Sequence, residues 1–167
     1  MSRLDSVIRR LQAQRACLER AVDLVRGLPG PVLELGLGQG RTFDHLRELC
    51  PEREIFVFDR QVAAAAECTP DADHLYLGDI RRTLPEAAAR FARAVPLVHS
   101  DIGTGHAGRN AELAAFLAVQ LPMLLRPRGV VVSDQDLAHD GAVPLPLPAG
   151  VAPGRYFMYR IADDRPS

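Results

Sequence analysis

The chain has 167 residues, of which 47% are hydrophobic and 25% are charged, and its formal net charge is −1. A chain of this length can bury a core without disulfides or metal, so we expect one domain over residues 1–167. The near-neutral balance provides no overall field that would recruit nucleic acid or a membrane surface. All 20 basic residues are arginine, which excludes mechanisms that need a lysine base or a Schiff base.

The cysteines and the N-terminus indicate where the protein works. Cys17, Cys50 and Cys68 have neither paired spacing nor the spacing of metal ligands, which fits a reducing compartment. The N-terminal region is arginine-rich and lacks the apolar core of a signal peptide, and no stretch of the chain is apolar enough to span a membrane. The sequence therefore predicts a cytoplasmic protein.

A long helix is predicted at the N-terminus, over about residues 2–28. Ser2 to Asp5 resembles a capping box, and apolar residues then recur at helical spacing until Gly27 and Pro29 end the pattern. We expect this helix to cover one face of a sheet. The alternative is a lid or a dimer face beside a ligand.

Strands and helices alternate through the middle of the chain. The predicted strands are 32–35, 54–59, 74–79, 96–101 and 129–134, and the predicted helices are 42–49, 61–67, 85–94 and 110–125. This order predicts an α/β three-layer sandwich with a mostly parallel, doubly wound sheet of six to seven strands. Alternate prolines exclude 143–148 from a central strand, whereas 155–161 is expected to return antiparallel into the sheet as the last strand.

Polar residues follow the end of each predicted parallel strand, where ligands bind in open α/β sheets. Glycines at alternate positions in Gly36–Gly40 follow the first strand and run into a helix, so backbone N–H groups can approach a ligand there. Acidic residues follow the other four strands, namely Asp59, Asp79, Asp101 and Asp134. Together they predict a nucleoside-binding edge, with the Asp59 carboxylate accepting hydrogen bonds from two ribose hydroxyls.

The glycine spacing distinguishes between cofactors. A dinucleotide fingerprint, G-x-G-x-x-G, would place its third glycine at position 41, where this chain has arginine. The run from Glu34 to Gly40 instead resembles motif I of class I S-adenosylmethionine-dependent methyltransferases. The resemblance continues through Asp59, Gly78-Asp79-Ile80 and 124–130, although Arg128 stands where that family usually has glycine. It covers Val32 to Asp134 and implies a Rossmann-like methyltransferase fold with S-adenosyl-L-methionine as cofactor.

The resemblance also implies roles for individual residues. Gly36 and Gly38 would bring backbone against the methionine part of the cofactor, and Glu34 would orient that loop. Asp59 would hold the ribose, and Asp79 would accept a hydrogen bond from the adenine amino group. The full set of predicted cofactor-binding residues is Glu34, Gly36, Leu37, Gly38, Gly40, Thr42, Asp59, Arg60, Gly78, Asp79, Ile80 and Ser100.

The segment after the fourth strand carries the predicted catalytic residues, Asp101 and His106. It lacks the motifs of amino-group DNA methylation and of cytosine C5 methylation, and the chain has no lysine for ribose 2′-O methylation. An imidazole with a pKa near ~6.5 is suited to removing a proton at neutral pH. A surface-loop histidine is the alternative interpretation of His106, and His99 is expected to pack or to hydrogen-bond in the core.

Asp134 and Gln135, after the fifth strand, are the predicted substrate-binding residues. Asp101 and Asp134 match two metal ligands of catechol-type, cation-dependent O-methyltransferases, but Gln135 stands where that group has asparagine. Oxygen ligands of this kind suit Mg²⁺. The mismatch leaves a divalent ion open, and our prediction includes no metal.

The resulting hypothesis is methyl transfer to a small-molecule acceptor, which Asp101 and His106 would position or deprotonate. We expect no nucleic-acid or membrane partner. Because no insertion is evident that would cap the acceptor pocket, we also expect a homo-oligomer. The alternatives are a non-catalytic sensor of S-adenosylmethionine or a nucleotide, and an NAD-dependent enzyme.

Overall fold

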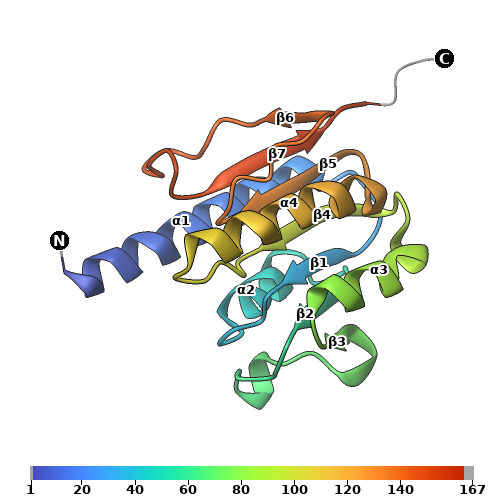
Figure 1. The fold of residues 1–167 in the computed structure, drawn as a ribbon, viewed down its shortest axis with the longest axis horizontal. Helices are drawn as coiled ribbons and strands as arrows, with labels where there is room; N and C mark the ends of the chain where they lie inside the picture. Colours follow the sequence, from blue (N-terminus) through green and yellow to red (C-terminus); the bar gives the residue numbers. More distant parts are fainter. Residues whose placement is uncertain (1, 164–167) are drawn as a thin grey trace.

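The computed structural model describes residues 2–163, and within them seven strands form one sheet in the order β3-β2-β1-β4-β5-β7-β6 (Figure 1). The strands are β1 Val32–Leu35, β2 Ile55–Asp59, β3 Leu75–Leu77, β4 Val95–Ser100, β5 Leu125–Ser133, β6 Ala142–Pro144 and β7 Phe157–Ile161. The first five pair in parallel, and β7 lies antiparallel between β5 and β6. The predicted sheet, including its antiparallel last strand in sequence, is confirmed.

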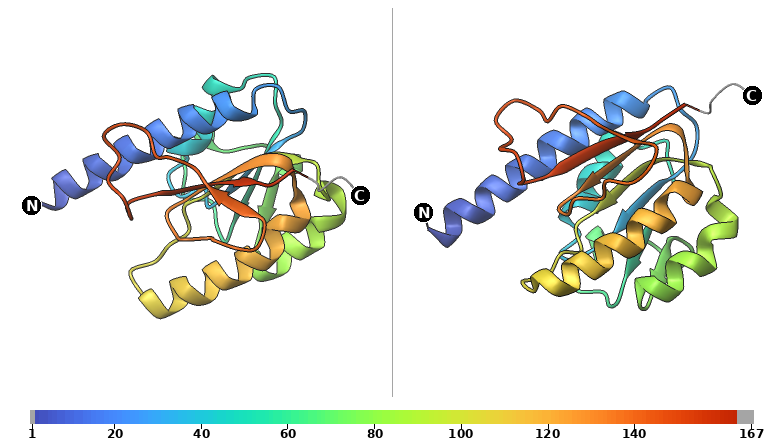
Figure 2. Two further views of the ribbon diagram at one scale, coloured as in Figure 1. Left: turned by 90° about the horizontal axis from the view of Figure 1, so that it is seen from above. Right: turned by 45° about the horizontal axis from the view of Figure 1, so that its top comes forward.

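Helices cover both faces of this sheet, which gives three layers (Figure 2). Helices α1 (Arg3–Val25) and α2 (Arg41–Leu49) enclose one hydrophobic cluster with the sheet. Helices α3 (Ile80–Phe91) and α4 (Ala107–Leu124) enclose a second cluster on the opposite face. Strands β1 and β4 are buried along their whole length, which explains their nearly continuous apolar sequences.

Helix α1 begins with the predicted capping box, in which Ser2 and Asp5 exchange hydrogen bonds between side chain and backbone. Its C-terminal half buries residues such as Leu18 and Val25 against the sheet, as predicted. The N-terminal half extends beyond the edge of the sheet, where the Leu4 side chain is 67% exposed (Figure 2). One element therefore packs as a covering helix over only part of its length.

The predicted alanine-rich helix at 61–67 is wrong. This segment forms no α-helix, and only a 3₁₀ turn, η1 (Ala66–Cys68), is present. An α-helix of seven residues is marginal without tertiary packing, and residues 61–63 are exposed. The segment instead packs against the glycine loop: a Cβ built on Gly40 would lie 3.0 Å from the Cβ of Ala64 and 2.4 Å from the carbonyl oxygen of Cys68, which directly follows the segment.

The third helix begins earlier than predicted. The predicted helix is 85–94, but α3 starts at Ile80 and contains Pro85 in its interior. Asp79 provides the start signal, because its side chain accepts a hydrogen bond from the backbone N–H of Arg81 at 2.9 Å. A second 3₁₀ turn, η2 (Ala72–His74), precedes β3.

Two features of the later chain agree with the sequence. Strand β6 is short and lies at the edge of the sheet, where Pro144 is tolerated because it need not donate to a further strand. Arg128, at the position where the methyltransferase family usually has glycine, adopts a left-handed backbone conformation with φ of 64°. The turn before the buried part of β5 therefore keeps a conformation that glycine favours.

Candidate active site

The glycine loop after β1 lies directly against the end of β4. Gly36 has a φ of 96°, and a Cβ built on it would lie 2.5 Å from Cγ2 of Ile102 and 2.9 Å from the carbonyl oxygen of Asp101. A side chain at this position would force the two segments apart. The glycine thus allows β1 and β4 to end close together at the same edge of the sheet.

Asp59, at the end of β2, is bonded to this loop. Its Oδ2 atom accepts hydrogen bonds from the backbone N–H groups of Leu37, at 2.7 Å, and Gly38, at 3.1 Å. A second contact connects the two ends of the loop, because the hydroxyl of Thr42 in α2 donates a hydrogen bond to Oε1 of Glu34 in β1. Asp59, the residue predicted to bind the ribose, therefore also fixes the conformation of the glycine loop.

A cavity of about 550 Å³ opens above these strand ends, a volume typical of small-ligand pockets. The predicted site residues that line it are Gly36, Gly38, Asp59, Arg60, Gly78, Ile80 and Asp101. The loop after β4 and the start of α4 close its other side, through residues such as Thr104 and Asn110. The remaining predicted cofactor residues do not line the cavity: Glu34, Leu37, Gly40, Thr42, Asp79 and Ser100.

A buried polar network lies beneath the cavity, on the α1 face of the sheet. Glu34 and His99 are both fully buried, and His99 Nδ1 is 2.7 Å from Oε2 of Glu34. Its Nε2 atom lies 2.9 Å from the hydroxyl of Tyr156. Burial lowers the pKa of His99, but the charge and hydrogen bond of Glu34 outweigh this, so the net pKa is raised. The raised pKa favours the protonated ring, in which both nitrogens can donate to these partners, and the expected core role of His99 is confirmed.

Asp101 connects this network to helix α1. Its Oδ2 atom accepts a hydrogen bond from Nε2 of Gln14, and Nη1 of Arg10 lies 3.7 Å from the same oxygen. Burial raises the pKa of Tyr156, and a hydrogen bond with Gln14 partly opposes this. Two residues of α1 therefore contact the end of β4, 87 residues away in sequence from Gln14.

Comparison with known proteins identifies the family. A family model described as S-adenosyl-L-methionine methyltransferase matches residues 1–161. The chain belongs to this methyltransferase family. A crystal structure of an S-adenosyl-L-methionine methyl transferase from Silicibacter pomeroyi DSS-3 is 44% identical, with a TM-score of 0.91, and the match covers 97% of this chain and 99% of that one. The protein is thus an S-adenosyl-L-methionine-dependent methyltransferase.

More distant structures share the methyltransferase fold. The N1-methyltransferase for 1,6-didemethyltoxoflavin from Burkholderia thailandensis has a TM-score of 0.56 at 17% identity, over 90% of this chain and 79% of that one. A fibrillarin/Nop5p complex has a TM-score of 0.55 at 14% identity, over 89% and 84% of the two chains. No curated protein matches this chain. At these identities the likeness shows the fold alone.

The predicted substrate residues of the methyltransferase, Asp134 and Gln135, lie against Gly103 in the loop after β4. Oδ2 of Asp134 accepts hydrogen bonds from the Gly103 N–H and from Nε2 of Gln135, both at 3.1 Å. Its Oδ1 atom is buried without a hydrogen-bond partner. Burial raises the pKa of Asp134, and the charge of Asp101 raises it further. Among residues 2–163 no cluster of three or more His, Cys, Asp and Glu side chains is arranged to hold a metal ion.

His106 is the residue before α4, and its imidazole is exposed rather than part of the cavity wall. The loop that leads to it is fixed by Asn110, whose Oδ1 accepts from the Thr104 N–H at 2.7 Å and whose Nδ2 donates to the Thr104 carbonyl at 2.7 Å. The structure does not bring His106 into contact with Asp101. Its predicted catalytic role stays a prediction.

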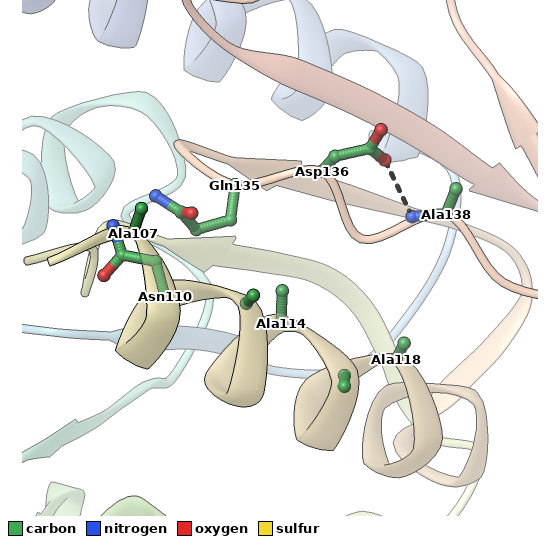
Figure 3. A pocket seen from close by; sticks show the side chains of 9 residues that line it. Ala107, Asn110, Ala114, Ala118, Gln135, Asp136 and Ala138 are labelled. Atoms are coloured by element: carbon green, nitrogen blue, oxygen red, sulfur yellow. Dashed lines mark hydrogen bonds between the residues drawn. The ribbon is translucent and has the colours of Figure 1, made fainter.

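A second, more open cavity of about 630 Å³ runs along α4, which we call the α4 groove (Figure 3). Its floor is mostly alanine, and its polar side chains are Asn110, Gln135 and Asp136. Figure 3 shows the amides of Asn110 and Gln135 close to each other at one end of the groove. Asn110 also lines the cavity of about 550 Å³ at the strand ends, so the two cavities share a wall.

The sequence analysis missed Arg10, Gln14 and Tyr156. All three lie outside the region that resembles the methyltransferase motifs, and they reach the site only through the packing of α1 and the chain before β7 on the sheet. One signal was available for Gln14, which is a polar residue at a helical spacing otherwise occupied by buried apolar residues. Within residues 2–163 no helix is long and apolar enough to cross a membrane.

Proposed function

We propose that this methyltransferase transfers a methyl group to a small molecule bound in the α4 groove. The observation that carries the proposal is the shared wall at Asn110, which joins the groove to the cavity lined by Gly36 and Asp59. Gln135, a predicted substrate residue, also lines the groove. The alanine floor fits an acceptor that is largely apolar, with one or two groups that hydrogen-bond to the amides of Asn110 and Gln135.

The residues of the less open cavity, of about 550 Å³, fit S-adenosyl-L-methionine. Gly36 has no room for a side chain, Gly38 has open space around it, and the Asp59 carboxylate lies beside Gly38. Asp59 would hold the ribose, Arg60 and Ile80 would flank the adenine, and Gly36 and Gly38 would contact the methionine part. When bound, this cofactor supplies a methyl group on an electrophilic sulfonium, so the protein need only align an acceptor and receive a proton.

We assign proton removal to His106 and a positioning role to Asp101. His106 directly precedes Ala107, which lines the α4 groove, so a small movement of the loop brings the imidazole over an acceptor there. Asp101 lines the cofactor cavity and is held by Gln14. Gln135 would contact the acceptor in the groove, and Asp134 would hold the Gln135 amide in place through its hydrogen bond.

The experiment is release of S-adenosylhomocysteine from S-adenosylmethionine across a panel of small hydroxyl and amino compounds, with and without Mg²⁺. With an acceptor found, His106→Ala should lower kcat by at least about a hundredfold, the lower end for general-base catalysis. Unchanged kcat in this variant rules out the proton-removal role. A requirement for Mg²⁺ would answer the question that Gln135 leaves open and favour a divalent ion held by Asp101 and Asp134.

A second variant tests the α4 groove itself. Ala115 is exposed in the wall of the groove, so Ala115→Leu should raise KM for the acceptor and leave affinity for S-adenosylhomocysteine unchanged. Ala89→Leu is the matched control, because Ala89 is an exposed alanine on α3 that does not line the groove. Equal effects of the two substitutions would place the acceptor elsewhere.

We further infer that the protein acts in the cytoplasm, as a homo-oligomer and without a nucleic-acid partner. The net charge of −1 supports the last point, and the exposed side chains of Leu4, Val7 and Ile8 on the free half of α1 support self-association. Light scattering after size-exclusion chromatography tests the oligomer. A monomer at micromolar concentration would refute it.

A further inference from the structure

Arg10 and Asp101 form an ion pair that leaves most of their hydrogen-bonding capacity unused. The nearest N–O distance is 3.7 Å, and the Arg10 side chain is 46% exposed whereas that of Asp101 is 19% exposed. Within residues 2–163 the Arg10 guanidinium, which carries five N–H donors, makes no hydrogen bond. A pair this long, with an arginine that is half exposed, contributes little to stability, so a ligand can separate the two groups at little cost.

This ion pair lies where the glycine loop meets the end of β4. The Asp101 carbonyl would be 2.9 Å from a Cβ on Gly36, and the Asp101 N–H donates to the Leu35 carbonyl at 3.0 Å. Gly36 is the residue expected to contact the methionine part of the cofactor, and Asp101 itself lines the cavity. The pair is therefore adjacent to the place where the methionine part has to lie.

The carboxylate of Asp101 is fixed on one side only. Gln14 donates to Oδ2, and among residues 2–163 no side chain or backbone group donates a hydrogen bond to Oδ1. Gln14 is buried, with 3% of its surface exposed, so it holds Asp101 in one orientation. An oriented carboxylate beside a guanidinium with free donors complements a group that carries both an ammonium and a carboxylate.

We propose that Arg10 and Asp101 bind the amino-acid end of the cofactor. The Arg10 guanidinium takes the carboxylate of the methionine part, and the Asp101 carboxylate takes its ammonium. Asp101 then contributes to the reaction by orienting the cofactor. Helix α1 is part of the cofactor site although it precedes every methyltransferase motif in the sequence. The inference rests on the cofactor that the family establishes and is independent of the acceptor.

Isothermal titration calorimetry with three ligands distinguishes the contact of Arg10 with the carboxylate from the contact of Asp101 with the ammonium. S-adenosylhomocysteine has both charged groups, its decarboxylated analogue has only the ammonium, and 5′-methylthioadenosine has neither. Arg10→Leu should weaken the binding of S-adenosylhomocysteine by about tenfold or more, as expected for the loss of hydrogen bonds between charged groups. The affinities of the other two ligands should change less than twofold. Asp101→Asn should lower the affinity for the first two ligands and leave the affinity for 5′-methylthioadenosine unchanged.

The neighbouring arginine gives a matched control. Arg9 is exposed on the same helix and lies one residue from Arg10, so Arg9→Leu makes the same change of charge and composition. It should leave all three affinities unchanged, and Arg10→Lys should retain part of the selectivity. Loss of all three affinities in Arg10→Leu, equal losses in Arg9→Leu, or no loss at all would each overturn the proposal. The acceptor screen can fail without affecting these measurements.

Discussion

Substitution of His99 by leucine is the sharpest test of the buried network. Glu34 and His99 are both 0% exposed, so the substitution leaves the Glu34 carboxylate in the core without its imidazolium partner. Breaking a buried ion pair by removing one partner costs about 3–5 kcal/mol. The Tyr156 hydroxyl also loses a hydrogen bond, which adds to this cost. Because domains of this kind are stable by about 5–15 kcal/mol, His99→Leu should remove a large part of the total.

Urea unfolding followed by circular dichroism measures this, since the chain has no tryptophan for fluorescence. The control is the double variant Glu34→Gln/His99→Leu, in which the buried charge is removed but an amide oxygen remains for the Thr42 hydroxyl. The double variant should be at least about 1 kcal/mol more stable than His99→Leu alone, because it carries no unpaired charge in the core. A loss below about 1 kcal/mol in the single variant, or a less stable double variant, would refute the reasoning.

Three further outcomes follow from the same contacts. Gly36→Ala should weaken S-adenosylhomocysteine binding by about tenfold or more in calorimetry, because its Cβ would lie 2.5 Å from Ile102, whereas Gly27→Ala, with nothing within 4 Å, should not. The pKa of His99 is raised above its ordinary 6.5, so the stabilisation that comes from its protonation is complete below pH 6.5 and is lost as the pH rises through the folded-state pKa. The difference in unfolding free energy between wild type and His99→Leu should therefore shrink over that pH range. The pKa of Asp134 is raised above 3.8 by burial and by Asp101, so ionisation destabilises the fold, and Asp134→Asn should raise the urea midpoint at pH 7 more than at pH 4.

The sequence was most informative where local chemistry and position coincide. Strand β1 has the predicted bounds, Val32–Leu35, because a short apolar run that ends in glycines has few other conformations open to it. Asp59 and Gly36 both line the predicted cavity, since the carboxyl ends of parallel strands meet at one edge of the sheet. The 61–67 helix was wrong because composition favoured a helix while contact with the glycine loop favoured an irregular chain.

By itself, then, the sequence determined the layered α/β fold, the glycine loop and the acidic strand ends, all of which depend on residues close together in the chain. Only the tertiary structure decided that Glu34, His99 and Tyr156 share one buried network and that Arg10 and Gln14 of α1 reach Asp101. These contacts join segments tens of residues apart, and no local pattern specifies which face of a helix meets which strand end. The packing of α1 across β4 and β5 supplies that information, and with it the proposed role of α1 in cofactor binding.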